Sequence, residues 1–281
     1  MTNLGFGIAR VELESDAEDS TPEPNDISGS DSNDNSQKPR KWVIFVPNVI
    51  PGELVRVRIY RNFNSYSDAD LVEILEPSPD RIDPKCSLAG ICGGCQYQHI
   101  TIDRQRSMKT MQVQELFERV GGLKADEFPK VLDTLGTDEV FGYRSKITPH
   151  YDAPLRTKRR RTPDEIAKDA TKEYEIGSIG FKEKNSRRLV DVPYCHIATP
   201  AINTALEKVR DETRAKAIAG KLKKPSKGAT LLLRDAGGIV ETNHTAYVNT
   251  NVGDLVFRFQ AGNFFQVCVN IILGDLCFSF L

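Results

Sequence analysis

The chain has 281 residues, a length typical of one large domain or of two domains of ordinary size. Its 38 basic and 39 acidic residues nearly cancel, so net charge alone predicts no class of partner. No apolar stretch reaches the roughly 18 residues of a membrane span, and the N-terminus lacks the basic and apolar regions of a secretory signal. We therefore expect no membrane partner and an intracellular protein, cytoplasmic or nuclear, with a mitochondrial location left open.

Cysteine usage points to a reducing compartment. Six cysteines stand at irregular spacing in a chain without an export signal, which argues against a disulfide framework. We therefore expect no disulfides, and we expect the protein to be a monomer. The cysteines then have two remaining uses, which are metal binding and packing.

The N-terminal part predicts a first strand at residues 5–11, followed by an acidic insertion. Residues 12–35 carry nine Asp and Glu side chains and no Lys or Arg, with Ser, Asn, Pro and Gly between them. Such a stretch cannot bury enough apolar surface to offset the entropy cost of ordering, so we expect a disordered insertion at 12–40. A regulatory acidic segment that mimics nucleic acid is the alternative.

Three further short strands complete the predicted N-terminal domain at 1–76, at residues 42–46, 54–60 and 70–75. Their spacing and tight turns predict a small β-barrel. In the second of them, alternation places Val55, Val57 and Ile59 on one face and Arg56, Arg58 and Tyr60 on the other. Basic and aromatic side chains on an outer face would suit RNA. An ordinary amphipathic strand is the other interpretation.

The central region, 77–260, reads as a β-rich α+β domain, so the predicted fold class is mainly β with α. Helical periodicity predicts helices at 101–120 and 198–220. Strand-like patterns cover residues 139–150, 174–193, 229–233, 238–248 and 253–260. A basic insertion at 152–172 interrupts the domain and is expected to be a solvated loop, a localisation signal or a phosphate contact.

Three cysteines lie within ten residues, at Cys86, Cys92 and Cys95, and glycines between them allow tight turns. Cys195, which follows a predicted strand and precedes a helix, is the best candidate for a fourth ligand. Four thiolates hold either zinc or a [4Fe–4S] cluster. Structural zinc sites usually have two close pairs, so three clustered cysteines and one distant cysteine fit the cluster better, with zinc or unligated thiols as alternatives.

Five segments, in this order, resemble motifs of the RNA uracil-5-methyltransferases that begin with a TRAM domain. They are the turn at 46–53, the cysteine segment at 82–99, the strand motif at 142–146, the stretch at 180–195, and 261–266, which ends in Phe264-Phe265-Gln266. The insertions are similar to those of the fungal tRNA uracil-54 branch. Five motifs in the family's order are far more specific than any one alone.

The resemblance implies an RNA-binding TRAM barrel, a central domain with an iron–sulfur cluster, and a Rossmann-like domain that binds S-adenosyl-L-methionine. In this family a Cys thiolate adds to C6 of uracil, C5 then takes the methyl group, and a carboxylate-type base removes the C5 proton. The target base must be unstacked. The implied partner is RNA, most directly tRNA. Arg144 and Lys146 alternate on one strand face and are candidate RNA contacts, with a surface salt bridge as the alternative.

The chain departs from the family after Gln266, which the resemblance places beside S-adenosylmethionine. Only 15 residues follow, too few for a βαβ unit of about 30 residues, and they contain no Gly-rich cofactor turn. We expect 261–281 to be the start of the methyltransferase domain plus an apolar tail foreign to the family, from a translated intron or a genuine short isoform. The chain is then the RNA-binding and cluster portion, catalytically inactive alone, and the alternatives are a non-enzymatic RNA-binding module and a zinc-stabilised adaptor.

Overall fold

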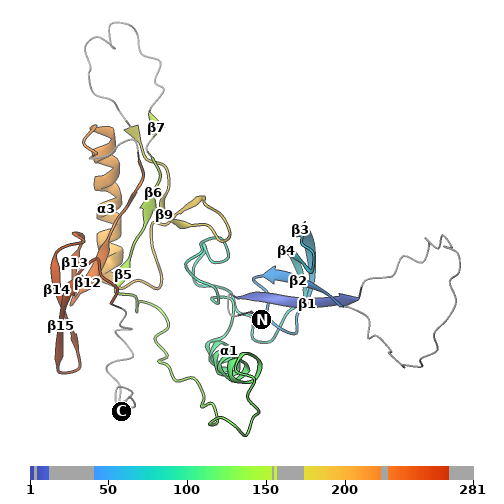
Figure 1. The fold of residues 1–281 in the computed structure, drawn as a ribbon. Coiled ribbons are helices and arrows are strands. Elements are labelled where there is room, and N and C mark those ends of the chain that lie inside the picture. Colours follow the sequence, from blue (N-terminus) through green and yellow to red (C-terminus); the bar gives the residue numbers. More distant parts are fainter. Residues whose placement is uncertain (3–4, 13–40, 154, 157–173, 223–226, 266–281) are drawn as a thin grey trace, which may run out of the picture. The chain divides into compact units, whose positions relative to one another are not determined.

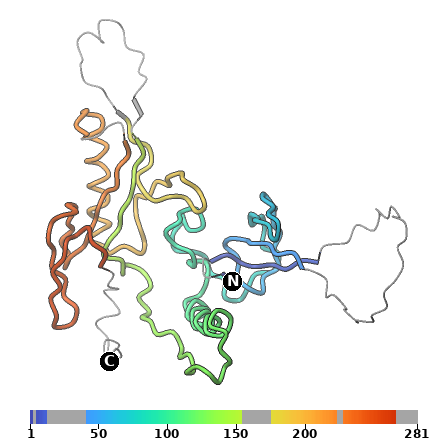
Figure 2. The backbone as a smooth tube through the Cα atoms, viewed as in Figure 1, coloured from blue at the N-terminus to red at the C-terminus, as the bar shows by residue number. Residues whose placement is uncertain are grey.

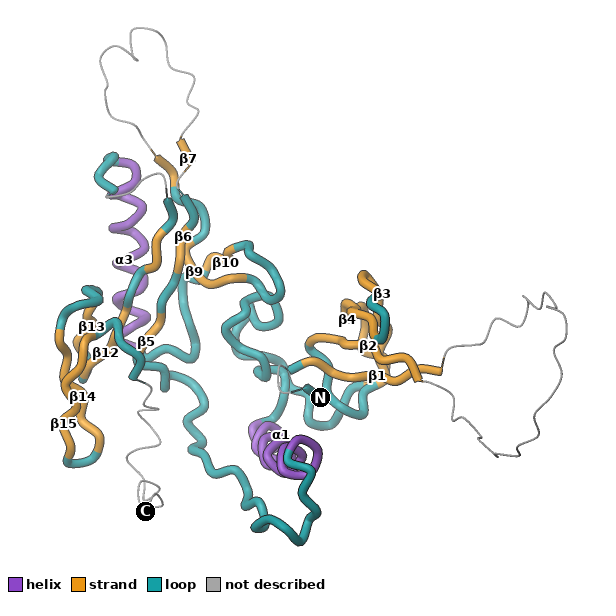
Figure 3. The backbone as a smooth tube through the Cα atoms, viewed as in Figure 1, coloured by secondary structure: helices purple, strands orange, loops and turns teal. Residues whose placement is uncertain are grey.

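A computed structural model describes residues 1–2, 5–12, 41–153, 155–156, 174–222 and 227–265 (Figure 1). Residues 13–40 of the predicted acidic insertion, most of the basic insertion, and Gln266 with all later residues lie outside the described residues. The chain forms two compact units, Met1–Ile82 and Asp83–Leu281. Strands predominate and helices are few (Figure 3), which confirms the predicted β-rich character. No described helix is long and apolar enough to cross a membrane.

The first unit is a four-stranded sheet with the order β1-β2-β4-β3. Its strands are β1 (Phe6–Glu12), β2 (Lys41–Pro47), β3 (Leu54–Asn62) and β4 (Tyr66–Glu76). β2 and β4 pair in parallel, and the other neighbours are antiparallel. Because β1 and β3 lie at the two edges, the described pairings make an open sheet without the closure that the predicted barrel requires.

Apolar alternation in β2 and β3 builds the core of this sheet. Ile44 and Val46 of β2 are buried, and Val55 and Val57 of β3 pack against the same cluster. The register between β3 and β4 shifts at three points along the ladder. Ile59 is 46% exposed, so the predicted separation of an apolar and a basic face holds only for the first half of β3.

A buried carboxylate organises the turn between β2 and β3. Glu53 accepts hydrogen bonds from the backbone N–H of Ile50 at 2.8 Å and of Ser78 at 3.1 Å. Arg81 Nη2 donates to Glu53 Oε2 at 2.7 Å. Burial alone would raise the pKa of Glu53, but the hydrogen bonds and the charge of Arg81 outweigh burial and lower that pKa. Gly52, at φ 97°, supplies the left-handed backbone of the turn.

The second unit contains the cysteine loop and then helix α1 (Ile102–Glu115), which continues into a π-helical turn, η1 (Leu116–Val120). Met108 is the buried residue of α1. Gly122 has a φ of 66° and ends the helical segment. The predicted helix at 101–120 is confirmed, with a change of helical type in its last turn.

Short strands form most of the remaining unit and pair as β10-β9-β6-β11, β13-β12-β5, β14-β15 and β7-β8. They are β5 (Lys146–Ile147), β6 (His150–Tyr151), β7 (Leu155–Arg156), β8 (Tyr174–Glu175), β9 (Ile179–Lys182), β10 (Leu189–Asp191), β11 (Ala229–Thr230), β12 (Leu233–Ala236), β13 (Ile239–Glu241), β14 (Tyr247–Val252) and β15 (Leu255–Gln260). The long predicted strands at 139–150 and 238–248 are broken. Pro149, which has no N–H, separates β5 from β6, and Asn243 caps the N–H of Thr245 at 3.1 Å between β13 and β14.

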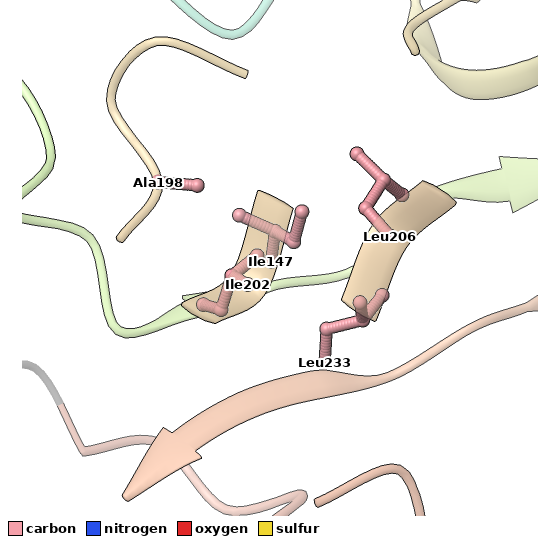
Figure 4. Close-up of a cluster of buried hydrophobic side chains, with 5 residues drawn as sticks. All are labelled: Ile147, Ala198, Ile202, Leu206 and Leu233. Carbon is pink, nitrogen blue, oxygen red and sulfur yellow. The ribbon is translucent and has the colours of Figure 1, made fainter. Parts of the chain in front are cut away.

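Helix α3 (Pro200–Ile218) packs on these strands, and the trace in Figure 2 follows it beside them. The Thr199 hydroxyl accepts the N–H of Ile202 at 3.4 Å as an N-cap, and Pro200 opens the first turn. This confirms the predicted helix at 198–220. Its apolar face contributes to a buried cluster (Figure 4) formed by Ile147, Ala198, Ile202, Leu206 and Leu233. That packing sets the start of α3, and hence the loop before it, against β5 and β12.

Candidate functional site

The loop with three cysteines folds through consecutive turns. The N–H of Ala89 donates to the carbonyl of Cys86 at 3.0 Å, and the N–H of Cys92 donates to the carbonyl of Leu88 at 2.9 Å. Gly90, between these turns, has a φ of 83°, which favours glycine. The loop is therefore compact, although it contains neither a helix nor a strand of the sheets.

Backbone hydrogen bonds attach this loop to β9 and the turn after it. The N–H of Gly93 donates to the carbonyl of Lys182 at 2.9 Å, and the N–H of Lys184 donates to the carbonyl of Ile91 at 2.8 Å. A β-carbon at Gly93 would lie 3.0 Å from the Lys182 carbonyl oxygen. Position 93 therefore suits glycine, because a β-carbon there would require the loop or the strand to shift by a few tenths of an ångström.

Cys195 lies in the loop between β10 and α3. Its backbone N–H donates to Asn203 Oδ1 at 2.8 Å, and Asn203 Nδ2 donates to its carbonyl at 3.1 Å. Buried Arg210 ties the end of β10 to α3, because its guanidinium bonds Asp191 Oδ2 at 2.7 Å and the Val192 carbonyl at 3.1 Å. Two residues of helix α3, Asn203 and Arg210, thus hold the segment that runs from the end of β10 to Cys195.

Cys86, Cys92, Cys95 and Cys195 all line one cavity of about 260 Å³ within the second unit. The four thiols are free of disulfide bonds. The structure thus brings together the cysteines of two segments that are far apart in sequence. Within the described residues, however, no three His, Cys, Asp or Glu side chains approach closely enough to hold a metal ion, so the thiols surround the cavity rather than gather at one point.

Burial raises the pKa of the Cys92 and Cys195 thiols, and the neighbouring cysteines add to the increase. Backbone amides act in the opposite direction. The N–H of Gly94 donates to Cys92 Sγ at 3.4 Å, and the N–H groups of Ile197 and Ala198 lower the pKa of Cys195 by hydrogen bonding. Amide donors directed at sulfur favour the thiolate, which is the form that binds metal. The donor set therefore fits a thiolate-bound metal group, whose binding would release protons.

Two basic side chains, Lys146 and Arg234, donate hydrogen bonds to backbone carbonyls of the segment at 261–265. Lys146 Nζ donates to the carbonyls of Gly262 at 2.8 Å and Asn263 at 3.1 Å. Arg234, which is 1% exposed, donates three hydrogen bonds of 2.7, 3.0 and 3.2 Å to carbonyls of the same segment. The Lys146 ammonium is therefore used inside the fold, where the sequence had suggested an RNA contact.

Three basic side chains, Arg144, Lys146 and Arg234, lie near the segment at 261–265. None of them takes part in an ion pair among the described residues. Burial lowers the pKa of Lys146, and the charges of Arg234 and Arg144 lower it further. Arg144 is exposed, and its Nε donates to the Lys146 carbonyl at 3.3 Å. Arg144 is thus the member of this group with a charge accessible to a phosphate.

The candidate RNA residues of the first unit lie on β3, beside carboxylates of β4. Arg56 pairs with Glu73, and Arg58 Nη2 lies 2.9 Å from Asp70 Oδ2. All four side chains are exposed or half exposed, so these pairs can open at low cost. Tyr60 is 54% exposed. The surface is therefore close to neutral as folded, which fits the amphipathic-strand interpretation as well as RNA contact.

Two residues that organise the site were not among the sequence candidates, namely Asn203 and Arg234. Each carries a weak local signal. Asn203 stands inside a helix, where Asn is unfavourable unless its amide has a specific partner. Arg234 directly follows the apolar run Leu231-Leu232-Leu233, and a charged residue in a buried strand requires hydrogen-bond acceptors.

No known protein-family profile matches the chain. A tRNA (uracil(54)-C(5))-methyltransferase of Schizosaccharomyces pombe is 36% identical over 233 residues, which make up 80% of this chain and 40% of that protein. A 23S rRNA (uracil(1939)-C(5))-methyltransferase of Mannheimia succiniciproducens is 29% identical over 226 residues, 76% of this chain and 45% of that protein. The chain thus spans less than half the length of these relatives.

The fold of the chain is also similar to that of a solved structure. The tRNA (uracil-54, C5)-methyltransferase of Pyrococcus abyssi, in complex with S-adenosyl-L-homocysteine, superposes with a TM-score of 0.51 at 18% identity. The match covers 81% of this chain and 58% of the archaeal one. Over about four-fifths of its length, the chain is therefore similar in sequence and in fold to enzymes that methylate C5 of uracil in RNA.

Proposed function

We propose that this chain is the RNA-binding and metal-binding portion of an S-adenosylmethionine-dependent uracil-C5-methyltransferase that acts on tRNA. The convergence of Cys86, Cys92, Cys95 and Cys195 on one cavity carries the proposal. Thiols from two distant segments that share a cavity and accept amide hydrogen bonds have the chemistry of a ligand set. The 36% identity to the fission yeast enzyme supports uracil in tRNA as the substrate.

The metal group that we propose is a [4Fe–4S] cluster held by these four thiolates. A cavity of about 260 Å³ has room for a group of several atoms, whereas a single zinc ion would require the sulfurs to close in around one point. The cluster would supply a cross-link between the loop at 86–95 and the start of α3. The chain's own part is to hold the thiols, shield them by burial and direct amide N–H groups at sulfur.

In this proposal S-adenosylmethionine supplies the methyl group, and no described residue of this chain is assigned as the catalytic nucleophile or base. Gln266 is the residue of this chain that the resemblance places beside the cofactor. Arg144 and the β3 residues Arg56, Arg58 and Tyr60 would contact RNA. The four-stranded first unit and the central domain would thus position the RNA.

Metal analysis of anaerobically purified protein tests the cluster. We expect a brown protein that absorbs at about 400 nm and contains iron and acid-labile sulfide in equal amounts. Cys195→Ser should lose most of the iron, and Cys268→Ser, outside the described residues, should retain it. Colourless protein with stoichiometric zinc would establish the zinc-stabilised adaptor in place of the cluster.

A methyl-transfer assay tests the assignment of the catalytic groups. The purified chain is incubated with a tRNA transcript that lacks modification and with methyl-labelled S-adenosylmethionine. We expect tRNA binding without label incorporation, because the covalent route needs the nucleophile and the base. Incorporation above a no-protein control would contradict the assignment and would mean that this chain contains an active site of its own.

A further inference from the structure

The position of Cys195 depends on one buried side chain, Asn203. The Asn203 amide accepts the Cys195 N–H at 2.8 Å and donates to the Cys195 carbonyl at 3.1 Å. The same Nδ2 also lies 3.3 Å from the carbonyls of Ala198 and Thr199. Asn203 is 7% exposed, so water does not replace these bonds. One amide therefore holds both peptide groups that flank the Cα of Cys195.

This arrangement needs the chemistry of an amide. An acceptor must meet the Cys195 N–H while a donor meets the carbonyls of Cys195 and Ala198, and the planar amide of Asn offers an acceptor oxygen and two donor hydrogens at the end of one side chain. Fixing both flanking peptides fixes the direction of the Cα–Cβ bond, and the sulfur is then limited to the few staggered χ1 positions about that bond. The first turn of α3 is itself anchored, since Thr199 Oγ1 donates to Asp235 Oδ2 of β12 at 2.6 Å.

The loop conformation that Asn203 imposes also shapes the surroundings of the sulfur. The N–H of Ala198 donates to the Cys195 carbonyl at 3.0 Å, so a turn begins at Cys195. Asn203 donates to the Cys195 and Ala198 carbonyls of this turn. Cys195 is also the one cavity cysteine outside the 86–95 loop, so no local turn sets its distance from the other three.

We propose that Asn203 is the positioning residue for Cys195, and that it holds this thiol at the cavity that the proposed metal group would occupy. The inference rests on the proposed function for the identity of the group. The hydrogen bonds between the Asn203 amide and the Cys195 backbone do not depend on which metal group binds. Residues that orient a metal ligand typically change metal affinity by about 10–100-fold when they are replaced.

The first measurement is the rate of iron loss from anaerobically purified full chain into an excess of ferrous chelator. Asn203→Leu should lose iron about 10-fold faster than the unchanged protein. Asn203→Asp, which keeps the acceptor but sets a carboxylate against three carbonyls, should also lose iron faster. The matched control is Thr213→Val, because Thr213 is a buried polar residue of the same helix that does not line the cavity. This control should weaken the fold without changing the rate of iron loss.

The second measurement needs no metal. In metal-free protein, the alkylation rate of each thiol is mapped by mass spectrometry, with Cys86 as the internal standard. Asn203→Leu and Asn203→Asp should raise the rate at Cys195 relative to Cys86, and Thr213→Val should leave the ratio unchanged. Folded Asn203 variants with an unchanged ratio and unchanged iron loss would overturn the proposal. If the protein without substitutions contains no iron, the cluster proposal alone is refuted. The alkylation ratio would still decide the role of Asn203.

Discussion

Replacing Arg234 by methionine should destabilise the second unit substantially, because the guanidinium is the main anchor of the segment at 261–265. Arg234 is 1% exposed, and all three of its hydrogen bonds end on carbonyls of that segment. Its guanidinium also lies over the ring of Phe259 at 5.3 Å, and Phe259 stacks on Phe265 with ring centroids 4.1 Å apart. Methionine retains the apolar stem and removes every donor.

The magnitude follows from the acceptors that lose a partner. Asn263 keeps a hydrogen bond from Lys146 at 3.1 Å, but the carbonyls of Ala261 and Phe265 lose their Arg234 donor. Each buried carbonyl left unpaired costs about 1–3 kcal/mol. Removing a buried charge returns part of that loss. We therefore expect the free energy of unfolding to fall by about 2–4 kcal/mol.

Urea denaturation followed by far-ultraviolet circular dichroism measures this change. Arg187→Met, at an exposed arginine, is the control and should stay within about 0.5 kcal/mol of the unchanged protein. Trp42 is the single tryptophan and lies in the first unit, so its fluorescence transition should not move. Removing Lys146 as well leaves the Asn263 carbonyl with neither donor. The free energy of unfolding of the double variant should therefore fall by at least about 0.5 kcal/mol more than the sum of the two single losses, because the two residues share a hydrogen-bond partner. A loss below about 0.5 kcal/mol for Arg234→Met would refute the reasoning.

Two further predictions concern the first unit. Glu53→Gln should cost about 3 kcal/mol at neutral pH, because it leaves the Arg81 charge with a neutral partner. The pKa of Glu53 is lowered in the folded state, so its contribution is complete above the unfolded pKa of about 4.3 and disappears as pH falls through the folded value. The gap between the urea midpoints of the two proteins should therefore shrink from pH 7 to pH 3, and a constant gap would contradict this account. Replacing Arg56 and Arg58 by alanine should change stability by less than about 1 kcal/mol, because both ion pairs are exposed. If these residues contact phosphates, filter binding should show weaker tRNA affinity and a salt slope smaller by about 1–2, whereas an unchanged slope would support the amphipathic-strand interpretation.

Much of the local structure follows from the sequence alone. Thr199 and Pro200 mark the start of α3, and Gly121-Gly122 mark the end of the first helical segment, because caps and glycines act within a few residues. The cysteine spacing and the distant Cys195 identify a candidate ligand set, because thiols in glycine-rich loops have few other uses. The long predicted strands were wrong in length where proline or an Asn-capped turn interrupts them, at Pro149 and Asn243.

The partners of the charged and polar side chains were decided only by the tertiary structure. Strand periodicity placed Lys146 beside Arg144 as an RNA contact, but Lys146 bonds carbonyls 116 and 117 residues further along the chain. The arginines on β3 face carboxylates of β4, and Asn203 meets Cys195 across the start of a helix. Periodicity reports which side of an element faces apolar surroundings. It does not report which distant segment supplies the hydrogen-bond partner, since that depends on how helices and sheets pack together.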